Sequence, residues 1–276
     1  MPLHRLDVSD DGWVDDPRLA AFRAVRDPEL VRQQARFLAE GRIVVRTLLL
    51  DSPLEAEAVL LEEPALTWFE AERVAWPDAL DVFVVPSGAM AQLGGFRFHQ
   101  GCLAAGVRPA PQRADAWFEA LDPTHHVVVG LDGVSNPDNV GAIFRTAAAL
   151  GAGGILLGPT CASPLYRKAI RSSMGAALRL PFCQVEDWQT GLDAFAAAGY
   201  ERLALTPDAA AEDLEALVVP WTREHRRALL LGAEGPGLGH DSLTQAEHRV
   251  RIPMDGGVDS LNVAAAAAVA LYALRG

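Results

Sequence analysis

Four short, continuous apolar runs in the second half of the chain constrain its fold more than any other feature. They read HHVVVGL, GGILLGP, RLALTP and RALLLG, and helix-like stretches such as VGAIFRTAAALG and WQTGLDAFAAAG separate them. Strands of a parallel sheet are apolar throughout because helices cover both of its faces, and they alternate with helices along the chain. The pattern therefore predicts an α/β domain with a parallel sheet over residues 121–276.

The preceding part predicts a smaller α/β domain, residues 25–106. The segment ELVRQQARFLAEG has the spacing of an amphipathic helix, and RIVVRTLLLD is rich in β-branched residues, which predicts a strand. Mixed segments ending at LDVFVVP and FHQGCLAAGVRP follow. The stretch GVRPAPQRADAW has two prolines and little periodicity, so we expect a linker there.

Composition excludes several classes of protein. Of the 276 residues, 50% are hydrophobic and 22% charged, as in an ordinary globular protein. No apolar run approaches the roughly 18 to 20 residues of a membrane span, and MPLHRLDVSDDGW does not resemble a secretion signal. Cys102, Cys161 and Cys183 lie far apart without a C-x-x-C spacing, so we expect small buried side chains. We expect a cytoplasmic protein with no membrane segment and no metal site.

The net charge of −12 is spread over both parts, with −7 on residues 1–105 and −5 on residues 106–276. A nucleic-acid binder needs basic groups for its phosphate contacts, so here such a footprint must be local. The best candidate is YRKAIRSSMGAALRLP, in which Arg167, Lys168 and Arg171 stand without an acid among them. A nucleic-acid contact and a solvated helix face are both open for this segment.

Three segments of the second part place a loop of glycine and polar residues directly after an apolar strand. They are VVVGLDGVSNPDNVGAIFRTAAALG, RALLLGAEGPGLG and RIPMDGGVDSLNVAAAAAVALYA. Ligands of open α/β sheets bind outside the carboxyl ends of the strands. We therefore expect the three loops to converge on one site.

The first loop leads into a helix for which Asp138 or Asn139 is a plausible N-cap. Gly141 is costly inside a helix, by about 1 kcal/mol relative to Ala. One explanation is that it lets the Arg145 guanidinium fold back toward the helix N-terminus and a phosphate held there. The alternative is that Gly141 permits tight helix packing and Arg145 pairs with a surface acid.

The second and third loops each carry polar candidates. Glu234 stands among glycines that match neither a dinucleotide fingerprint nor a P-loop. It is a candidate ion-pair partner of Arg145, and a plain surface turn is the alternative. In the third segment we expect a strand over 249–254, a loop over 255–259, and Ser260 as the N-cap of a helix that reaches Leu274. Asn262 would project from the first turn of that helix.

Together these segments resemble the three motifs of the SpoU family of RNA ribose 2′-O-methyltransferases, a branch of the SPOUT superfamily. The resemblance rests on NVGAIFR (139–145), LGAEGPGLG (231–239) and IPMDGGVDSLNV (252–263), and RKAIRSSMGAALRLP resembles the segment after the first motif. Ala233, where many members have Asn, occurs in the branch that modifies guanosine in large-subunit ribosomal RNA. Ala264 replaces a common Ser. The first part more loosely resembles a ribosomal-protein-L30-like substrate-binding domain, with ARFLAEGRIVVRTLL as its opening helix and strand.

The resemblance implies a trefoil-knotted parallel sheet, a homodimer and S-adenosylmethionine as cofactor. It implies a cofactor pocket lined by Gly232, Ile252, Leu261, Leu157 and Met254, and a polar functional set of Asn139, Arg145, Glu234, Ser260 and Asn262. Because a guanidinium pKa above about 12 makes it a poor base, we expect Arg145 to clamp a phosphate and the developing alkoxide. Glu234 would orient Arg145, and Ser260 and Asn262 would hydrogen-bond the ribose or the cofactor.

The expected substrate is 23S ribosomal RNA, with transfer RNA as the nearest alternative. A housekeeping modification and an antibiotic-resistance role are both open. Two other classes stay in view: a non-catalytic RNA-binding protein of the same fold, and a nucleotide-cofactor oxidoreductase. The missing dinucleotide fingerprint disfavours the oxidoreductase.

Overall fold

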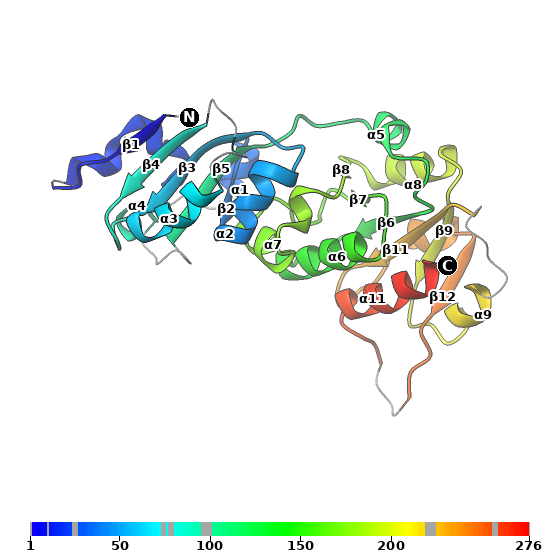
Figure 1. The fold of residues 1–276 in the computed structure, drawn as a ribbon. Coiled ribbons are helices and arrows are strands. Elements are labelled where there is room, and N and C mark those ends of the chain that lie inside the picture. The colour runs from blue at the N-terminus through cyan, green and yellow to red at the C-terminus, as the bar shows by residue number, and fades with distance from the viewer. Residues whose placement is uncertain are drawn as a thin grey trace. The chain divides into compact units, whose positions relative to one another are not determined.

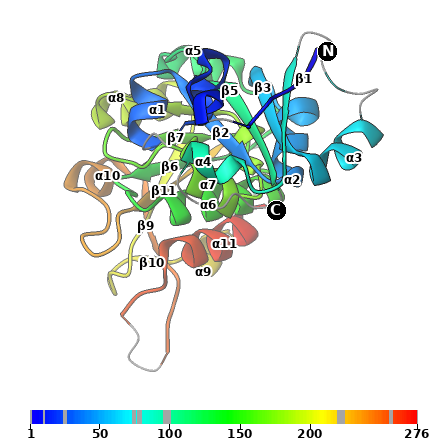
Figure 2. The same ribbon diagram turned by 90° about the vertical axis from the view of Figure 1, so that its left-hand side faces the viewer.

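The fold is taken from a computed structural model of the chain, which describes residues 2–9, 11–23, 27–72, 76, 80–94, 101–218, 225–255 and 259–275. Its contacts divide the chain into two units. The first comprises Met1–Pro109 with Leu165–Arg179, and the second comprises Ala110–Pro164 with Leu180–Gly276. Figures 1 and 2 show the elements of both units. The basic segment after the first motif is thus part of the first unit.

The first unit is built on a five-stranded mixed sheet in the order β1-β4-β3-β5-β2. Its strands are β1 (Leu3–Arg5), β2 (Arg36–Glu40), β3 (Ala56–Glu62), β4 (Asp81–Val85) and β5 (Cys102–Val107). β4 pairs in parallel with β1 and β3, whereas β5 runs antiparallel to β3 and β2. The helical elements are η1 (Asp11–Asp15), η2 (Pro17–Phe22), α1 (Asp27–Arg32), α2 (Arg42–Arg46), the π-helical turn η3 (Thr47–Asp51), α3 (Glu63–Ala71), α4 (Met90–Gly94), α7 (Arg167–Ser172) and η6 (Ala176–Leu178).

The expected opening helix is present only in its first residues, which belong to α1, and the expected strand was wrong. Residues 36–40, predicted as part of a helix, form β2, and RIVVRTLLLD, predicted as a strand, forms α2 and η3. The switch falls at Gly41, whose φ of 92° is strained for any residue with a side chain. The buried residues Val44, Val45, Leu48 and Leu49 recur at helical spacing, and this periodicity prevails over their β-branched character.

The second unit is built on a seven-stranded sheet in the order β10-β12-β9-β11-β6-β7-β8, and every pairing is parallel, as predicted. Its strands are β6 (Val127–Asp132), β7 (Ile155–Leu157), β8 (Phe182–Gln184), β9 (Glu201–Leu205), β10 (Glu212–Asp213), β11 (Arg227–Gly232) and β12 (His248–Arg251). Its helices are α5 (Ala114–Ala120), α6 (Pro137–Ala149), α8 (Trp188–Ala197), α9 (Leu214–Val218), α10 (His240–Gln245) and α11 (Val263–Leu274).

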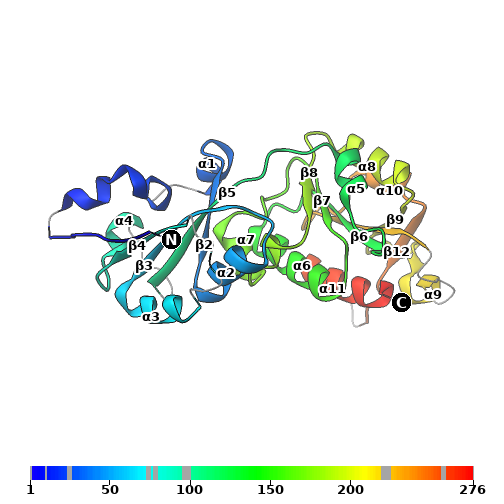
Figure 3. The same cartoon turned by 45° about the horizontal axis from the view of Figure 1, so that its top comes forward.

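Helices cover both faces of this sheet, which explains why its strands are apolar at successive positions. Val128 of β6 packs in a core with Phe118 of α5 and Phe195 of α8. Figures 1 and 3 show α5 and α8 on one side of the sheet and α6 and α11 together on the other. All residues of β6 from Val127 to Leu131 are buried. Within the described ranges, no helix is both long and apolar enough to span a bilayer.

Candidate active site

The loop after β11 folds tightly back on itself and presents Glu234 near its tip. The backbones of Ala233 and Gly237 exchange two hydrogen bonds of 3.1 and 3.0 Å. A Cβ on Gly232 would lie 2.1 Å from the carbonyl carbon of Gly237, which no side chain tolerates. Gly235 and Gly237 adopt φ values of 91° and 75°. The glycines of this segment are therefore required by the turn.

Glu234 is the meeting point of the three motifs. Its Oε1 accepts a hydrogen bond of 2.6 Å from Asn139 Nδ2 and one of 3.0 Å from Asn262 Nδ2. Asn262 Nδ2 also lies 3.2 Å from Asn139 Oδ1. The predicted convergence is thus present, as a cluster of one carboxylate and two amides. The expected ion pair between Glu234 and Arg145 is replaced by these amide contacts.

Asn262, and not Ser260, caps α11. Its Oδ1 accepts hydrogen bonds from the backbone amides of Ala264 (3.0 Å) and Ala265 (3.4 Å). Ser260 lies two residues earlier, exposed. The N-cap prediction was therefore wrong by two residues. The preceding strand is shorter than expected, since β12 ends at Arg251, and residues 256–258 of the predicted loop lie outside the described residues.

The cap of α6 also differs from the prediction. Asn136, rather than Asp138 or Asn139, caps this helix, with its Oδ1 2.9 Å from the Asp138 amide. This places Asn139 inside the first turn, 8% exposed, where its amide reaches Glu234. Gly141 is buried in α6, which packs against α11, as in the packing explanation for this glycine.

Arg145 projects from the exposed side of α6. Among the residues that the structure describes, its guanidinium makes neither a hydrogen bond nor an ion pair. Its expected partner in the chain, Glu234, is occupied by amides. A cation in this state is available for an external anion.

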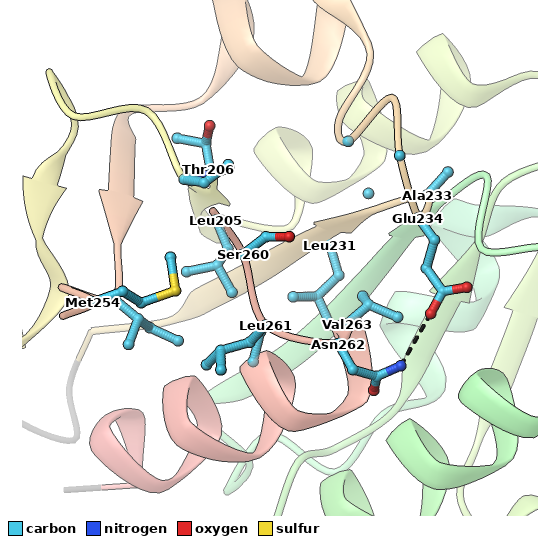
Figure 4. A pocket seen from close by; sticks show the side chains of 16 residues that line it. Leu205, Thr206, Leu231, Ala233, Glu234, Met254, Ser260, Leu261, Asn262 and Val263 are labelled. Carbon is cyan, nitrogen blue, oxygen red and sulfur yellow. Dashed lines mark hydrogen bonds between the residues drawn. The ribbon is translucent and has the colours of Figure 1, made fainter. Parts of the chain in front are cut away.

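A pocket of about 410 Å³ lies beside the cluster. Figure 4 shows Leu205, Leu231, Met254 and Leu261 around it, with Glu234 and Asn262 joined at its edge. Its lining is Leu205, Thr206, Pro207, Leu231, Gly232, Ala233, Glu234, Gly235, Gly237, Ile252, Met254, Ser260, Leu261, Asn262, Val263 and Ala266. These residues lie at or beyond the carboxyl ends of β9, β11 and β12, including the start of α11, and this is the edge where a parallel sheet binds its ligands.

The pocket includes four of the five predicted cofactor residues: Gly232, Ile252, Met254 and Leu261. Leu157 does not line it, because this residue is fully buried within β7, between β6 and β8. Leu261 is 40% exposed, which is unusual for a leucine and leaves it open to a ligand. The apolar walls and the close backbone of the glycine loop suit a flat, partly apolar ligand.

The sequence analysis did not predict the side of the pocket that is formed at the end of β9. Leu205, Thr206 and Pro207 line the pocket, and the signal was the Thr-Pro step that ends the apolar run RLALTP. It also missed Asp132 at the end of β6. Asp132 Oδ2 accepts hydrogen bonds from Ser242 Oγ (2.7 Å) and from the Gly239 amide (3.0 Å), which fastens the end of the glycine loop.

The predicted RNA-binding residues lie in the first unit. Arg167 is engaged there, because its Nε lies 2.6 Å from Asp27 Oδ1 and its backbone amide donates to Asp27 Oδ2 at 3.0 Å. Lys168 and Arg171 are exposed.

The described part of the chain contains no group of three or more His, Cys, Asp or Glu side chains arranged to hold a metal ion. All three cysteines are buried as free thiols. Burial raises the pKa of Cys102 to about 12 and those of Cys161 and Cys183 to about 11. Thiols in this state are poor nucleophiles at neutral pH.

Comparison with known proteins places this site in a family. Residues 126–272 match the model of the SpoU rRNA Methylase family. The chain is 39% identical to an uncharacterised tRNA/rRNA methyltransferase of Mycobacterium tuberculosis over 279 residues. This alignment covers 97% of this chain and 91% of the relative. It is 31% identical over 203 residues to a 23S rRNA (guanosine-2′-O-)-methyltransferase of Acinetobacter baylyi, covering 72% of this chain and 80% of that protein.

The fold has a counterpart among solved structures. An AdoMet-bound rRNA methyltransferase from Sinorhizobium meliloti superposes with a TM-score of 0.78 at 24% identity, over 99% of this chain and 97% of the other. This likeness concerns the fold. The segment that matches the family model contains all three motifs and the pocket. The two relatives are 39% and 31% identical to this chain over most of its length. The chain therefore belongs to the SpoU rRNA methylase family of RNA methyltransferases.

Proposed function

We propose that this protein transfers a methyl group from S-adenosylmethionine to a ribose 2′-hydroxyl of ribosomal RNA. The observation that carries the proposal is the cluster of Asn139, Glu234 and Asn262 at the edge of the apolar pocket. The 23S rRNA (guanosine-2′-O-)-methyltransferase of Acinetobacter baylyi supports the choice of a ribosomal ribose.

The pocket residues fit the cofactor's chemistry. S-adenosylmethionine supplies an electrophilic methyl group on a sulfonium. The apolar side chains of Leu205, Ile252 and Leu261 would hold a flat adenine, and the backbone of the glycine loop would provide polar contacts at close range. Ser260, at the same rim, would hydrogen-bond the ribose or the cofactor.

Methyl transfer to a ribose hydroxyl has two requirements that the protein must meet. A ribose hydroxyl is a poor nucleophile, so it must be held in line with the methyl group and must lose its proton as the O–C bond forms. We assign Arg145 the role of stabilising the developing alkoxide and the neighbouring phosphate, because it is exposed, permanently charged and without a partner among the described residues. The two amides fix the position of the Glu234 carboxyl group at the pocket edge.

The proposal includes a cytoplasmic homodimer. The outward side of α11 exposes Val269 (47%) and Tyr272 (59%), large apolar side chains that a monomer usually buries. The adjacent helix α6 exposes Arg145 on its own outer side. A second copy seated on this helix pair would cover the apolar residues. The first unit would serve as the substrate-binding domain.

The test is incubation with methyl-labelled S-adenosylmethionine and either unmodified ribosomal RNA or unmodified transfer RNA, followed by mapping of 2′-O-methyl sites. We expect label at one ribosomal ribose. Arg145→Ala should abolish it, whereas Arg113→Ala, which removes an exposed arginine directly before α5 together with its Asp115 contact, should retain it. Label only on transfer RNA would move the substrate to that class. Thermal stabilisation by S-adenosylhomocysteine without label on either RNA would contradict the proposal and indicate a non-catalytic binding protein.

A further inference from the structure

One residue, Asp132, contacts both ends of the glycine loop, residues 232–239. At the start of the loop, Gly232 pairs with Asp132 in the register of β11 and β6. At its end, Asp132 Oδ2 accepts a hydrogen bond of 3.0 Å from the Gly239 amide. A single residue therefore closes the base of the loop that carries Glu234.

The glycine loop depends on contacts from outside to keep one shape. The backbones of Ala233 and Gly237 exchange two hydrogen bonds, and Gly235 and Gly237 have positive φ values. Glycine loses more backbone freedom on folding than any other residue, so the ordering of this loop is costly. Asp132 supplies a fixing contact at the base of the loop.

Asp132 is itself held in place from several sides. It ends β6, which lies between β11 and β7 in the sheet, and the preceding Leu131 carbonyl accepts a hydrogen bond of 2.8 Å from the Gly158 amide. The Ser242 hydroxyl donates to Asp132 Oδ2 at 2.7 Å and accepts a hydrogen bond of 2.7 Å from Trp188 Nε1. The direction of Oδ2 is thus set by contacts from α8 and α10.

Gly239 permits the close approach of this carboxylate. Its φ of −65° suits any residue, so the backbone conformation does not require a glycine here. A Cβ on Gly239, however, would lie only 3.1 Å from Asp132 Oδ2. The contact with Asp132 therefore accounts for the missing side chain.

A purely structural role for Asp132 would be the capping of α10, because Gly239 is the N-cap of that helix. Other contacts already hold α10. Gln189 of α8 and Gln245 of α10 exchange amide hydrogen bonds of 3.1 and 2.6 Å, and Leu238 is buried in the core beneath α5 and α8. What Asp132 adds to these contacts is the closure of the loop.

We propose that Asp132 is a positioning residue for methyl transfer, which closes the glycine loop into the shape that binds S-adenosylmethionine. The proposal rests on the proposed function and adds a residue that sets the cofactor affinity without lining the pocket itself. Asp132 acts through the loop, because Gly232 and Glu234 line the pocket and move when the base opens. The role needs an acceptor oxygen and not a negative charge, since the Gly239 amide and the Ser242 hydroxyl both donate.

The first experiment compares Asp132→Ala with Asp132→Asn, and Asp241→Ala is the matched control. Asp132→Ala removes the acceptor, whereas Asp132→Asn keeps a carbonyl oxygen for both hydrogen bonds. Asp241 is exposed in the first turn of α10 and does not line the pocket. Affinity for S-adenosylhomocysteine is measured by calorimetry at a temperature at which every variant is folded. We expect Asp132→Ala to bind it about ten- to hundredfold more weakly, Asp132→Asn to recover most of the loss, and the control to match wild type.

Two further readouts separate positioning from stability. In steady-state methylation, Asp132→Ala should raise KM for S-adenosylmethionine and leave kcat within about threefold, because saturating cofactor holds the loop closed. Amide hydrogen exchange of residues 232–239 should be faster in Asp132→Ala and return toward wild type in Asp132→Asn. A structural role alone would lower the melting temperature of Asp132→Ala and leave KM and the affinity unchanged.

Gly239→Ala tests the contact from the other side. The added Cβ displaces the Asp132 carboxylate while suiting the backbone, so this variant should bind S-adenosylhomocysteine more weakly than wild type. In the Asp132→Ala background the same substitution should cause no further loss, because the contact is already absent. Additive losses would show that the two residues act independently and would overturn the proposal.

Failure of the proposed function gives a different result. If the wild type neither binds S-adenosylhomocysteine nor methylates RNA, the proposed function fails, and amide exchange still decides whether Asp132 closes the loop. If the wild type binds the cofactor product and Asp132→Ala binds it equally well, Asp132 is not a positioning residue. An equal loss in Asp132→Asn and Asp132→Ala would show that the charge matters, and would overturn the acceptor role.

Discussion

Asn262 Nδ2 donates a hydrogen bond of 3.0 Å to Glu234 Oε1, and the same asparagine is the N-cap of α11. One end of the Asn262 side chain caps α11, and the other end holds the carboxylate at the pocket edge. The position of α11 and the orientation of Glu234 are therefore set by one residue. This explains the polar step in front of the alanine-rich helix.

Substitution of Asn262 should separate these two tasks. Asn262→Ala removes both the cap and the amide, and we expect a loss of about 1 kcal/mol in the free energy of unfolding together with loss of methyl transfer. Asn262→Ser keeps an oxygen for the cap, so it should recover most of the stability and little of the activity. Urea unfolding and single-turnover methylation check the pair. Recovery of wild-type activity in Asn262→Ser would show that only the cap matters.

Gly232→Ala should disable the pocket. The added Cβ would meet the backbone of Gly237 at 2.1 Å, so the loop must open and Glu234 must move. We expect the affinity for S-adenosylhomocysteine to fall at least about tenfold in calorimetric titration, since the displaced loop lines the pocket. Gly199→Ala is the control, because its φ of 75° brings strain without a clash, at a position outside the pocket. Unchanged affinity in Gly232→Ala would mean that the loop does not contact the ligand.

Ser242, which follows the second motif closely along the chain, should matter to stability. It is fully buried, donates to Asp132 and accepts a hydrogen bond of 2.7 Å from Trp188 Nε1. Ser242→Ala leaves Trp188 Nε1 without its acceptor and removes one of the two hydrogen bonds to Asp132 Oδ2, so we expect a loss of about 1 to 3 kcal/mol in urea unfolding. The exposed Ser135→Ala should change the midpoint little. Equal midpoints for the two variants would refute a structural role for this hydrogen-bond chain.

The three cysteines should be inert in the folded protein. Burial raises their pKa values from 9.0 to about 11 or 12, so their thiolates are scarce at pH 8. Iodoacetamide should label none of them until urea unfolds the chain, as mass spectrometry would detect. Because the unfolded chain ionises its thiols near pH 9 and the folded chain does not, stability should fall as the pH rises above 9. Rapid labelling of the native protein would show that at least one thiol is accessible.

The N-cap of α8, Asp187, should make the free energy of unfolding depend on pH in the acidic range. Hydrogen bonds from the Thr190 amide and hydroxyl, at 3.1 and 3.0 Å, lower the pKa of Asp187 below its ordinary 3.8. Stability from a lowered carboxylate pKa is present above the ordinary value and is lost as the pH falls through the folded one. The difference in melting temperature between wild type and Asp187→Ala should therefore be constant from pH 5 to 7 and shrink below about pH 4. A difference that grew in acid would contradict this assignment.

The second unit was predictable because burial on two faces leaves a strong signal in its strands. The apolar runs of β6, β7, β9 and β11 were recognised, and so were the loops that follow β6, β11 and β12. The first unit lacked such a signal. Residues 36–49 alternate between helix and strand over few residues, and tertiary pairing of β2 with β5 decides their state.

The N-cap residues of α6 and α11 could be predicted from the sequence only in part. Pro137 stands at the first position of α6, which favours a cap at Asn136, and this signal was available. At α11 both Ser260 and Asn262 are good caps by type. The choice depends on Asn139 and Glu234, which are distant along the chain. Leu157 was assigned to the pocket by the family resemblance alone, and the structure buries it within β7 instead.

The hydrogen bond between Asn262 and Asn139 spans 123 positions of the chain, and this separation has a kinetic consequence. Contacts of such long range form late, because the intervening loops must close before the contacts contribute stability. In a refolding experiment, helix and sheet signals should recover before the ability to bind S-adenosylhomocysteine. The interval between the two is a period in which the protein is already compact and still unable to act as a catalyst.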